Sequence, residues 1–127
     1  MIAVDTSALV AIVLKEPQAD ACLAALGADD EVLMSAGTLA EVFIVSARRN
    51  VGAEMARLID GLAPNVVPVT SAVARRIGEA YSRWGRGVHP AALNLGDCFA
   101  YAIAQEHACG LLYVGDDFAK TDIEAVL

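Results

Sequence analysis

The sequence predicts a single α/β domain in which a mostly parallel sheet is flanked by helices. Short apolar runs alternate with longer segments of helical spacing along the whole chain, a pattern typical of parallel strands joined by helices. The length of 127 residues suits one compact domain, and 57% hydrophobic residues supply a sizeable core. Because the sequence contains no repeat, linker or low-complexity tract, we expect residues 1–127 to form one domain.

The individual elements follow from periodicity and from turn residues. Pro17 suits the first turn of a helix, and Thr6 or Ser7 is expected to cap the helix before it. Gly85 and Pro90 make residues 85–93 a loop. Strands are expected at 1–4, 32–34 and 111–115, with a short extended piece at 65–69, and helices at 7–15, 17–26, 38–49, 52–62, 71–84 and 95–108.

The apolar runs are too short for a membrane protein. The longest stretch without a charge or histidine is 61–74, and Pro64 and Pro68 interrupt it, whereas a spanning helix needs roughly 20 mainly apolar residues. The amino terminus shows no basic region followed by an apolar core and a cleavage site. We therefore expect a soluble, cytoplasmic protein with no membrane partner. The three cysteines lack metal-type spacing and are expected to be free thiols.

The distribution of charge leaves room for a nucleic-acid partner despite a net charge of −7. Arg83, Trp84 and Arg86 lie in or beside the glycine-broken loop, where arginine and an aromatic ring can grip phosphates and stack on an unpaired base. The alternative is a helix end with Trp84 packed on the core and the arginines solvated. Seven of the nine basic residues fall in two segments: Arg48, Arg49 and Arg57, and then Arg75, Arg76, Arg83 and Arg86.

Five acids stand at places where a site is expected. Asp5 ends the first strand, and Asp116 and Asp117 follow the last; in open parallel sheets, ligands bind beyond the carboxyl ends of the strands. Glu41 and Asp97 are each embedded in an apolar helix start. Each acid also has a structural alternative. "TLAE" at 38–41 matches a capping box, "NLGD" at 94–97 resembles one, and Asp116 or Asp117 suits a turn cap.

Taken together, these acids indicate a metal site. Two carboxylates about 4 Å apart repel by roughly 4 kcal/mol at an effective dielectric near 20, so a convergent cluster needs protons or a cation. Oxygen ligands with no histidine or cysteine nearby favour Mg²⁺ or Mn²⁺. Such an ion typically works on phosphates, where it orients a water for in-line attack and stabilises charge on the phosphorus oxygens.

Four blocks of the sequence resemble the PIN-domain ribonucleases. They are "AVDTSALVAIVLKEP", "SAGTLAEVFIV", "LNLGDCFAYAIA" and "LLYVGDDFAKTDI". Their order and spacing, over essentially the whole chain, most resemble the VapC toxins of type II toxin–antitoxin pairs. The resemblance implies a PIN-like fold and an endoribonuclease with a Mg²⁺ or Mn²⁺ site held by Asp5, Glu41 and Asp97. The fourth acid is then Asp116 or Asp117, with Asp122 nearby.

The resemblance also implies partners. It implies a structured RNA substrate such as transfer or ribosomal RNA, a homodimer, and a small cognate antitoxin whose tail enters the active-site groove. We expect the dimer contact on apolar helices, with 38–47 and 52–62 as candidates. Thr6 and Ser7 match the hydroxyls beside the first acid; they either hold Asp5 or a metal-bound water, or simply cap the helix.

Three other functions fit the residues less well. An aspartyl phosphatase would use Asp5 as a nucleophile, but it usually has a second Asp two residues on, where this chain has Ser7. A catalytically silent PIN-like module that only binds RNA or protein would lack one of the acids, and here the set is intact. A phosphoacceptor receiver domain needs a lysine after a late strand, for which Lys120 is a poor candidate.

Overall fold

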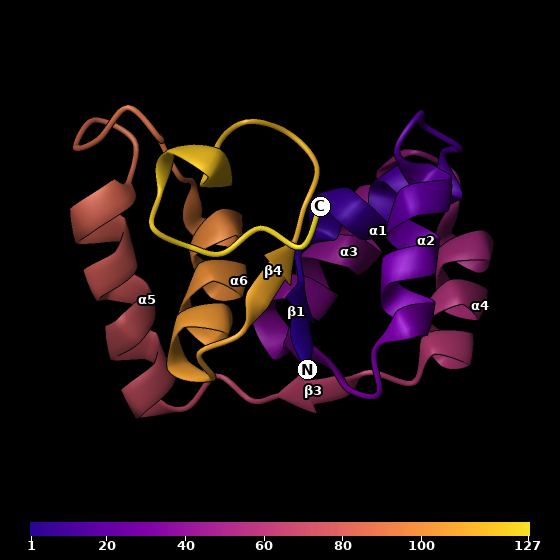
Figure 1. Cartoon of the computed structure of the whole chain (residues 1–127), viewed down its shortest axis with the longest axis horizontal. Coiled ribbons are helices and arrows are strands. Elements are labelled where there is room, and N and C mark those ends of the chain that lie inside the picture. The colour runs from indigo at the N-terminus through magenta and orange to yellow at the C-terminus, as the bar shows by residue number, and fades with distance from the viewer.

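Four short parallel strands form the centre of the protein, in the order β3–β2–β1–β4 (Figure 1). The computed structural model describes residues 1–127. Strand β1 (Ile2–Val4) pairs with β2 (Val32–Ser35) on one side and with β4 (Gly110–Leu112) on the other. The edge strand β3 (Asn65–Val67) pairs with β2. Every pairing is parallel, which confirms the predicted fold class.

The helices cover both faces of this sheet (Figure 1). Strand side chains alternate between the two faces. The helices are α1 (Thr6–Val13), α2 (Ala19–Ala28), α3 (Ala36–Arg48), α4 (Gly52–Leu62), α5 (Ser71–Trp84) and α6 (Leu95–Glu106), and a 3₁₀ turn, η1, spans Phe118–Lys120. Ala3, Leu33 and Leu111 belong to one core cluster with residues of α5 and α6. Their neighbours Val4 and Leu112 belong to a second cluster with residues of α1, α2, α3 and α4.

The boundaries differ from the predicted ones at two places that bear on the site. Strand β4 ends at Leu112 rather than at 115, and Gly115 then takes a φ of 111°, which favours glycine and turns the chain away from the sheet. Helix α3 begins at Ala36 rather than at 38, because Ser35 caps it by accepting from the amide of Gly37 at 3.2 Å. The loop 85–93 lies where it was predicted, between α5 and α6. Cys22, Cys98 and Cys109 are free.

None of the helices combines the length and the apolar character that a membrane crossing requires.

Candidate active site

Asp5 stands directly after β1, at the carboxyl edge of the sheet, and caps α1. Its Oδ2 accepts hydrogen bonds from the amide of Ser7 at 3.0 Å and from the Ser7 hydroxyl at 2.7 Å. The expectation that Thr6 or Ser7 caps this helix was wrong, because the aspartate itself is the N-cap. The Ser7 hydroxyl makes a second contact, since its Oγ also accepts from the amide of Val114 at 3.0 Å. Ser7 therefore ties Asp5 to the segment that follows β4.

The second oxygen of Asp5 has no hydrogen-bond partner. Asp5 is only 4% exposed, and its Oδ1 is fully buried without a donor. Burial raises the pKa of Asp5 from its ordinary value of 3.8 to about 7; the bonds from Ser7 oppose this, and the negative charges of Asp97 and Glu41 add to it. A buried carboxylate oxygen without a donor is costly unless the group takes up a proton or a cation pairs with it. Asp5 therefore has the surroundings expected of a metal ligand.

Glu41 approaches this edge from α3. Because α3 begins at Ala36, Glu41 lies in the second turn and does not complete the expected "TLAE" capping box. Its Oε1 instead accepts a hydrogen bond of 2.5 Å from the Thr6 hydroxyl. Its Oε2 lies against Gly96 at the start of α6, so closely that a Cβ on Gly96 would overlap the carboxylate. Thr6 and Gly96 thus fix the position of Glu41.

Asp97 belongs to a capping box and also feels the charge of neighbouring acids. Asn94 and Asp97 form a capping box: Asn94 Oδ1 accepts from the Asp97 amide at 2.8 Å, and Asp97 Oδ2 accepts from the Asn94 amide at 3.0 Å. The pKa of Asp97 is nevertheless raised, first by burial and then by the charges of Asp117 and Glu41. The capping box therefore orients a carboxylate that belongs to the same electrostatic cluster.

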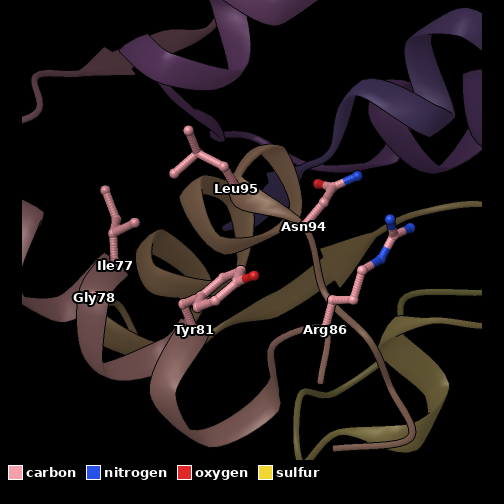
Figure 2. A pocket seen from close by; sticks show the side chains of 6 residues that line it. All are labelled: Ile77, Gly78, Tyr81, Arg86, Asn94 and Leu95. Carbon is pink, nitrogen blue, oxygen red and sulfur yellow. The ribbon is translucent and has the colours of Figure 1, made fainter. Parts of the chain in front are cut away.

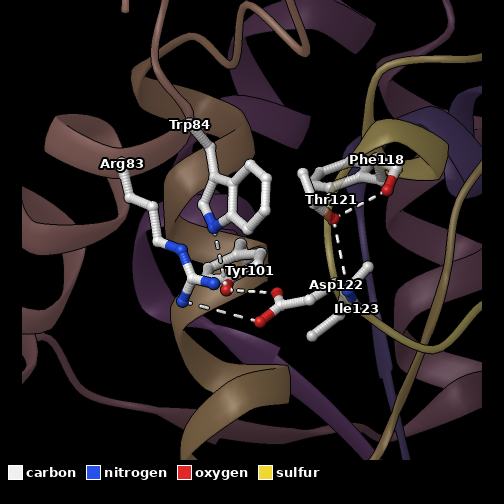
Figure 3. Close-up of polar contacts among 7 residues, drawn as sticks. All are labelled: Arg83, Trp84, Tyr101, Phe118, Thr121, Asp122 and Ile123. Carbon is white, nitrogen blue, oxygen red and sulfur yellow. Dashed lines mark hydrogen bonds and ion pairs between the residues drawn. The ribbon is translucent and has the colours of Figure 1, made fainter. Parts of the chain in front are cut away.

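The structure distinguishes among the acids at the end of the chain. Asp116 and Asp117 are both exposed in the turn after β4, but only Asp117 contributes to the raised pKa of Asp97. Asp122 is engaged elsewhere. Its Oδ1 accepts from the Tyr101 hydroxyl at 2.6 Å, and its Oδ2 lies 3.6 Å from the Arg83 guanidinium (Figure 3). These contacts favour Asp117 as the fourth acid.

Trp84 is packed in the core, which agrees with the structural alternative and not with base stacking. It is 8% exposed, and its indole N–H donates to the Tyr101 hydroxyl at 3.0 Å (Figure 3). Arg83 lies 4.6 Å from the centre of the Trp84 ring and pairs with Asp122. Arg86 is exposed in the loop after α5. Of the three residues expected to contact RNA, only Arg86 is thus free of partners among the side chains.

The acids at this edge of the sheet offer the oxygen ligands that a hard divalent cation prefers, but they are not arranged around a binding position for one. Asp5, Glu41, Asp97 and Asp117 offer oxygen atoms only, and the buried Oδ1 of Asp5 faces no donor. However, no three carboxylate, imidazole or thiol side chains are assembled so that they could hold a metal ion as they stand. The carboxylates would therefore have to come closer together before they could hold an ion.

A groove between α3 and α6 leads to Glu41. It has a volume of about 500 Å³, and it carries the Glu41 carboxylate together with the cationic side chain of Arg48. We call it the α3–α6 groove; it is lined by Gly37, Ala40, Glu41, Ile44, Val45, Arg48, Asn94, Leu95, Gly96 and Phe99. It gives an extended ligand a path to the acids.

The raised pKa of Asp5 predicts how metal-free stability depends on pH. Between pH 3.8 and about 7, the folded protein holds a proton on Asp5 that the unfolded chain has lost. The free energy of unfolding should therefore fall as pH rises through this window, by up to about 1.4 kcal/mol per pH unit from this group. Urea unfolding in the presence of a chelator at pH 5 and pH 8 measures this change in the free energy of unfolding. Asp5→Asn should flatten the profile; equal pH slopes for the two proteins would contradict the assignment.

Comparison with known proteins agrees with the sequence resemblance. The PIN domain profile matches residues 2–124. VapC ribonuclease Mb2780c of Mycobacterium bovis is 43% identical over 125 residues, which cover 94% of this chain and 95% of the relative. Ribonuclease VapC36 of Mycobacterium tuberculosis is 44% identical over 125 residues, covering 95% and 90%.

Two solved structures share the fold. One is the crystal structure of Mycobacterium tuberculosis VapC20, described as a sarcin–ricin loop cleaving toxin, with a TM-score of 0.80 and 17% identity over 99% of this chain and 98% of that one. The other is a toxin–antitoxin complex from Klebsiella pneumoniae, with a TM-score of 0.72 and 21% identity over 96% and 93%. At these identities the likeness concerns the fold.

Proposed function

We propose that this chain is a toxin endoribonuclease and that it cleaves RNA with a metal-activated water. The premise is that the chain belongs to the PIN-domain family and, within it, to the VapC ribonucleases. The observation that carries this proposal is the buried, unpartnered Oδ1 of Asp5, which lies within the electrostatic reach of Glu41 and Asp97. Such a carboxylate at the carboxyl edge of a parallel sheet stands where this fold class binds its ligands.

Each acid has a neighbour that orients it. Ser7 fixes Asp5 through two hydrogen bonds, Thr6 fixes Glu41, and Asn94 fixes Asp97. We assign the ligand role to these three acids and place Asp117 as the fourth. A bound Mg²⁺ or Mn²⁺ would supply positive charge for the phosphorus oxygens and would acidify a water.

The α3–α6 groove suits the tail of a cognate antitoxin. Without a cation, the acids beside the groove are not neutralised by any basic side chain of this protein, since the ion pairs found within it involve Asp29, Glu54 and Asp122 only. An arginine from a partner would form bidentate hydrogen bonds with such carboxylates. Entry of that side chain would exclude both the cation and RNA.

For a homodimer, α3 is the better of the two helices considered. It exposes two large apolar side chains, Phe43 at 49% and Ile44 at 59%. Helix α4 turns Met55 and Ile59 into the core and exposes no large apolar side chain. We therefore place the dimer contact on α3, around Phe43, which does not line the α3–α6 groove. The RNA target is proposed to be a structured transfer or ribosomal RNA.

The test is a cleavage assay with purified protein freed of any antitoxin. Total transfer and ribosomal RNA should be cut in Mg²⁺ or Mn²⁺, should remain intact in EDTA, and should remain intact with Asp97→Asn. Asn at this position retains an oxygen acceptor for the capping box, so a folded but inactive variant separates catalysis from structure. Cleavage that persists in EDTA or in Asp97→Asn would refute a metal-dependent reaction at this site.

A further inference from the structure

A second depression lies between α5 and the start of α6 (Figure 2). Ile77 and Tyr81 project from α5 on one side, and Leu95 stands on α6 on the other. Its volume of about 550 Å³ falls within the range of small-ligand sites. We call it the α5–α6 pocket; it is lined by Ile77, Gly78, Tyr81, Arg86, Asn94 and Leu95.

The α5–α6 pocket adjoins the acids. Asn94 and Leu95 line both this pocket and the α3–α6 groove. Asn94 is also the partner of Asp97 in the capping box, and Gly96, next in the chain, touches Glu41. A chain molecule that lies across Asn94 and Leu95 therefore reaches the α5–α6 pocket on one side and Glu41 in the α3–α6 groove on the other.

The chemistry of the α5–α6 pocket suits a nucleotide. Tyr81 offers an aromatic ring that is 40% exposed, and Leu95 offers an apolar wall that is 61% exposed. Arg86 supplies a cation for a phosphate, and no acid lines the pocket. An exposed aromatic ring beside an arginine is the combination with which proteins bind unpaired bases.

Gly78 leaves room for a ligand at the edge of the α5–α6 pocket. It lies in the middle of α5, where glycine is less favourable than any residue except proline. A Cβ at this position would meet no atom within 4 Å, so neither packing nor backbone conformation requires glycine. Gly78 lines the α5–α6 pocket and also the neighbouring depression of Arg75, Glu79, Ser82 and Arg83. With no side chain, Gly78 leaves both depressions open at this point.

We propose that the α5–α6 pocket holds one unpaired base of the RNA substrate, which stacks on Tyr81 beside Leu95 and above the buried Ile77, while Arg86 contacts the adjoining phosphate. This inference rests on the proposed ribonuclease function and adds to it a subsite that selects single-stranded nucleotides beside the cleaved bond. The aromatic residue that contacts RNA is then Tyr81, one turn before the buried Trp84.

The test measures binding, independently of cleavage. Fluorescence anisotropy in EDTA follows a labelled short single-stranded RNA and a matched strand with abasic residues. Tyr81→Ser should weaken binding of the first RNA by roughly five- to 150-fold, the range that corresponds to loss of one stacked base, and should leave the abasic strand unaffected. Tyr81→Phe should bind within about twofold of the wild type, because the ring is retained.

The variant Gly78→Ala separates a loss of RNA binding from a loss of folding. Alanine should raise the melting temperature, since it favours the helix, and yet weaken RNA binding severalfold. Gly52→Ala is the matched control, because Gly52 is an exposed helical glycine with open space around it outside both depressions.

Unchanged RNA affinity in Gly78→Ala and Tyr81→Ser would overturn the proposal. So would a loss of affinity that sedimentation traces to dissociation of a dimer, which would assign the pocket to a second copy of the chain. Wild-type protein that binds this RNA but cuts none would refute the ribonuclease function and leave the subsite standing.

Discussion

Replacing Asp5 with asparagine is expected to abolish RNA cleavage and, at neutral pH without metal, to stabilise the fold. The loss should be at least about a thousandfold, more than removal of a single hydrogen-bond donor to a transition state usually costs. Asparagine keeps an oxygen that can accept from Ser7 and cap α1. It also removes a buried carboxylate that has one oxygen without a hydrogen-bond partner and that the negative charges of Asp97 and Glu41 repel. Cleavage should be followed on total RNA and stability by urea unfolding in chelator.

The matched control is Asp60→Asn, which neutralises an exposed acid on α4 and should change neither quantity. An Asp5→Asn protein that unfolds well below the wild type would mean that the carboxylate is there to cap α1. In that case the loss of cleavage would carry no information about a metal site.

Gly96→Ala is expected to lower cleavage by about ten- to one-hundred-fold, the usual effect of disturbing a partner of a metal ligand, with little change in stability. The added Cβ would overlap the carboxylate of Glu41. Because that carboxylate is the end of a flexible side chain, it should swing away and lose its bond with Thr6. The backbone of Gly96 is helical, so alanine itself introduces no strain and even favours the helix.

A double-mutant cycle tests whether this effect passes through Glu41. If it does, Gly96→Ala should cost nothing further in a Glu41→Ala background, since the displaced group is already gone. Additive losses would show that Gly96 acts independently of Glu41. Gly52→Ala, which introduces the same methyl group into open space, should leave cleavage unchanged.

The places of the acids in the fold were predictable because the sequence signals for them are short-range. Asp5 and Asp117 follow apolar strands, and the structure indeed places Asp5 at the carboxyl edge of a parallel sheet. Membership of the PIN-domain family, expected from the four blocks, is confirmed. The partners of Glu41 were not predictable, since Thr6 lies 35 residues away in the chain. A capping box at 38–41 was the local alternative, and it failed because Ser35 starts α3 earlier.

The exposure of Tyr81, the aromatic residue that we propose to contact RNA, could have been predicted from the sequence. Val73, Ile77, Ala80 and Trp84 repeat with helical spacing, and all four are buried. That periodicity places Trp84 near the centre of the core face and Tyr81 at its margin. The composition of "SRWGRG" points to Trp84, but position on the helix decides which ring is exposed.

Binding of a divalent cation tests the proposed metal centre without any RNA. The free Mn²⁺ signal in electron paramagnetic resonance, titrated with wild-type protein at pH 7.5, measures this binding. We predict that wild-type protein removes Mn²⁺ from solution and gains thermal stability as it does so, and that Asp5→Asn does neither. Wild-type protein that leaves the Mn²⁺ signal unchanged at millimolar ion, or an Asp5→Asn variant that binds as well as the wild type, would contradict a metal centre built on Asp5, Glu41 and Asp97.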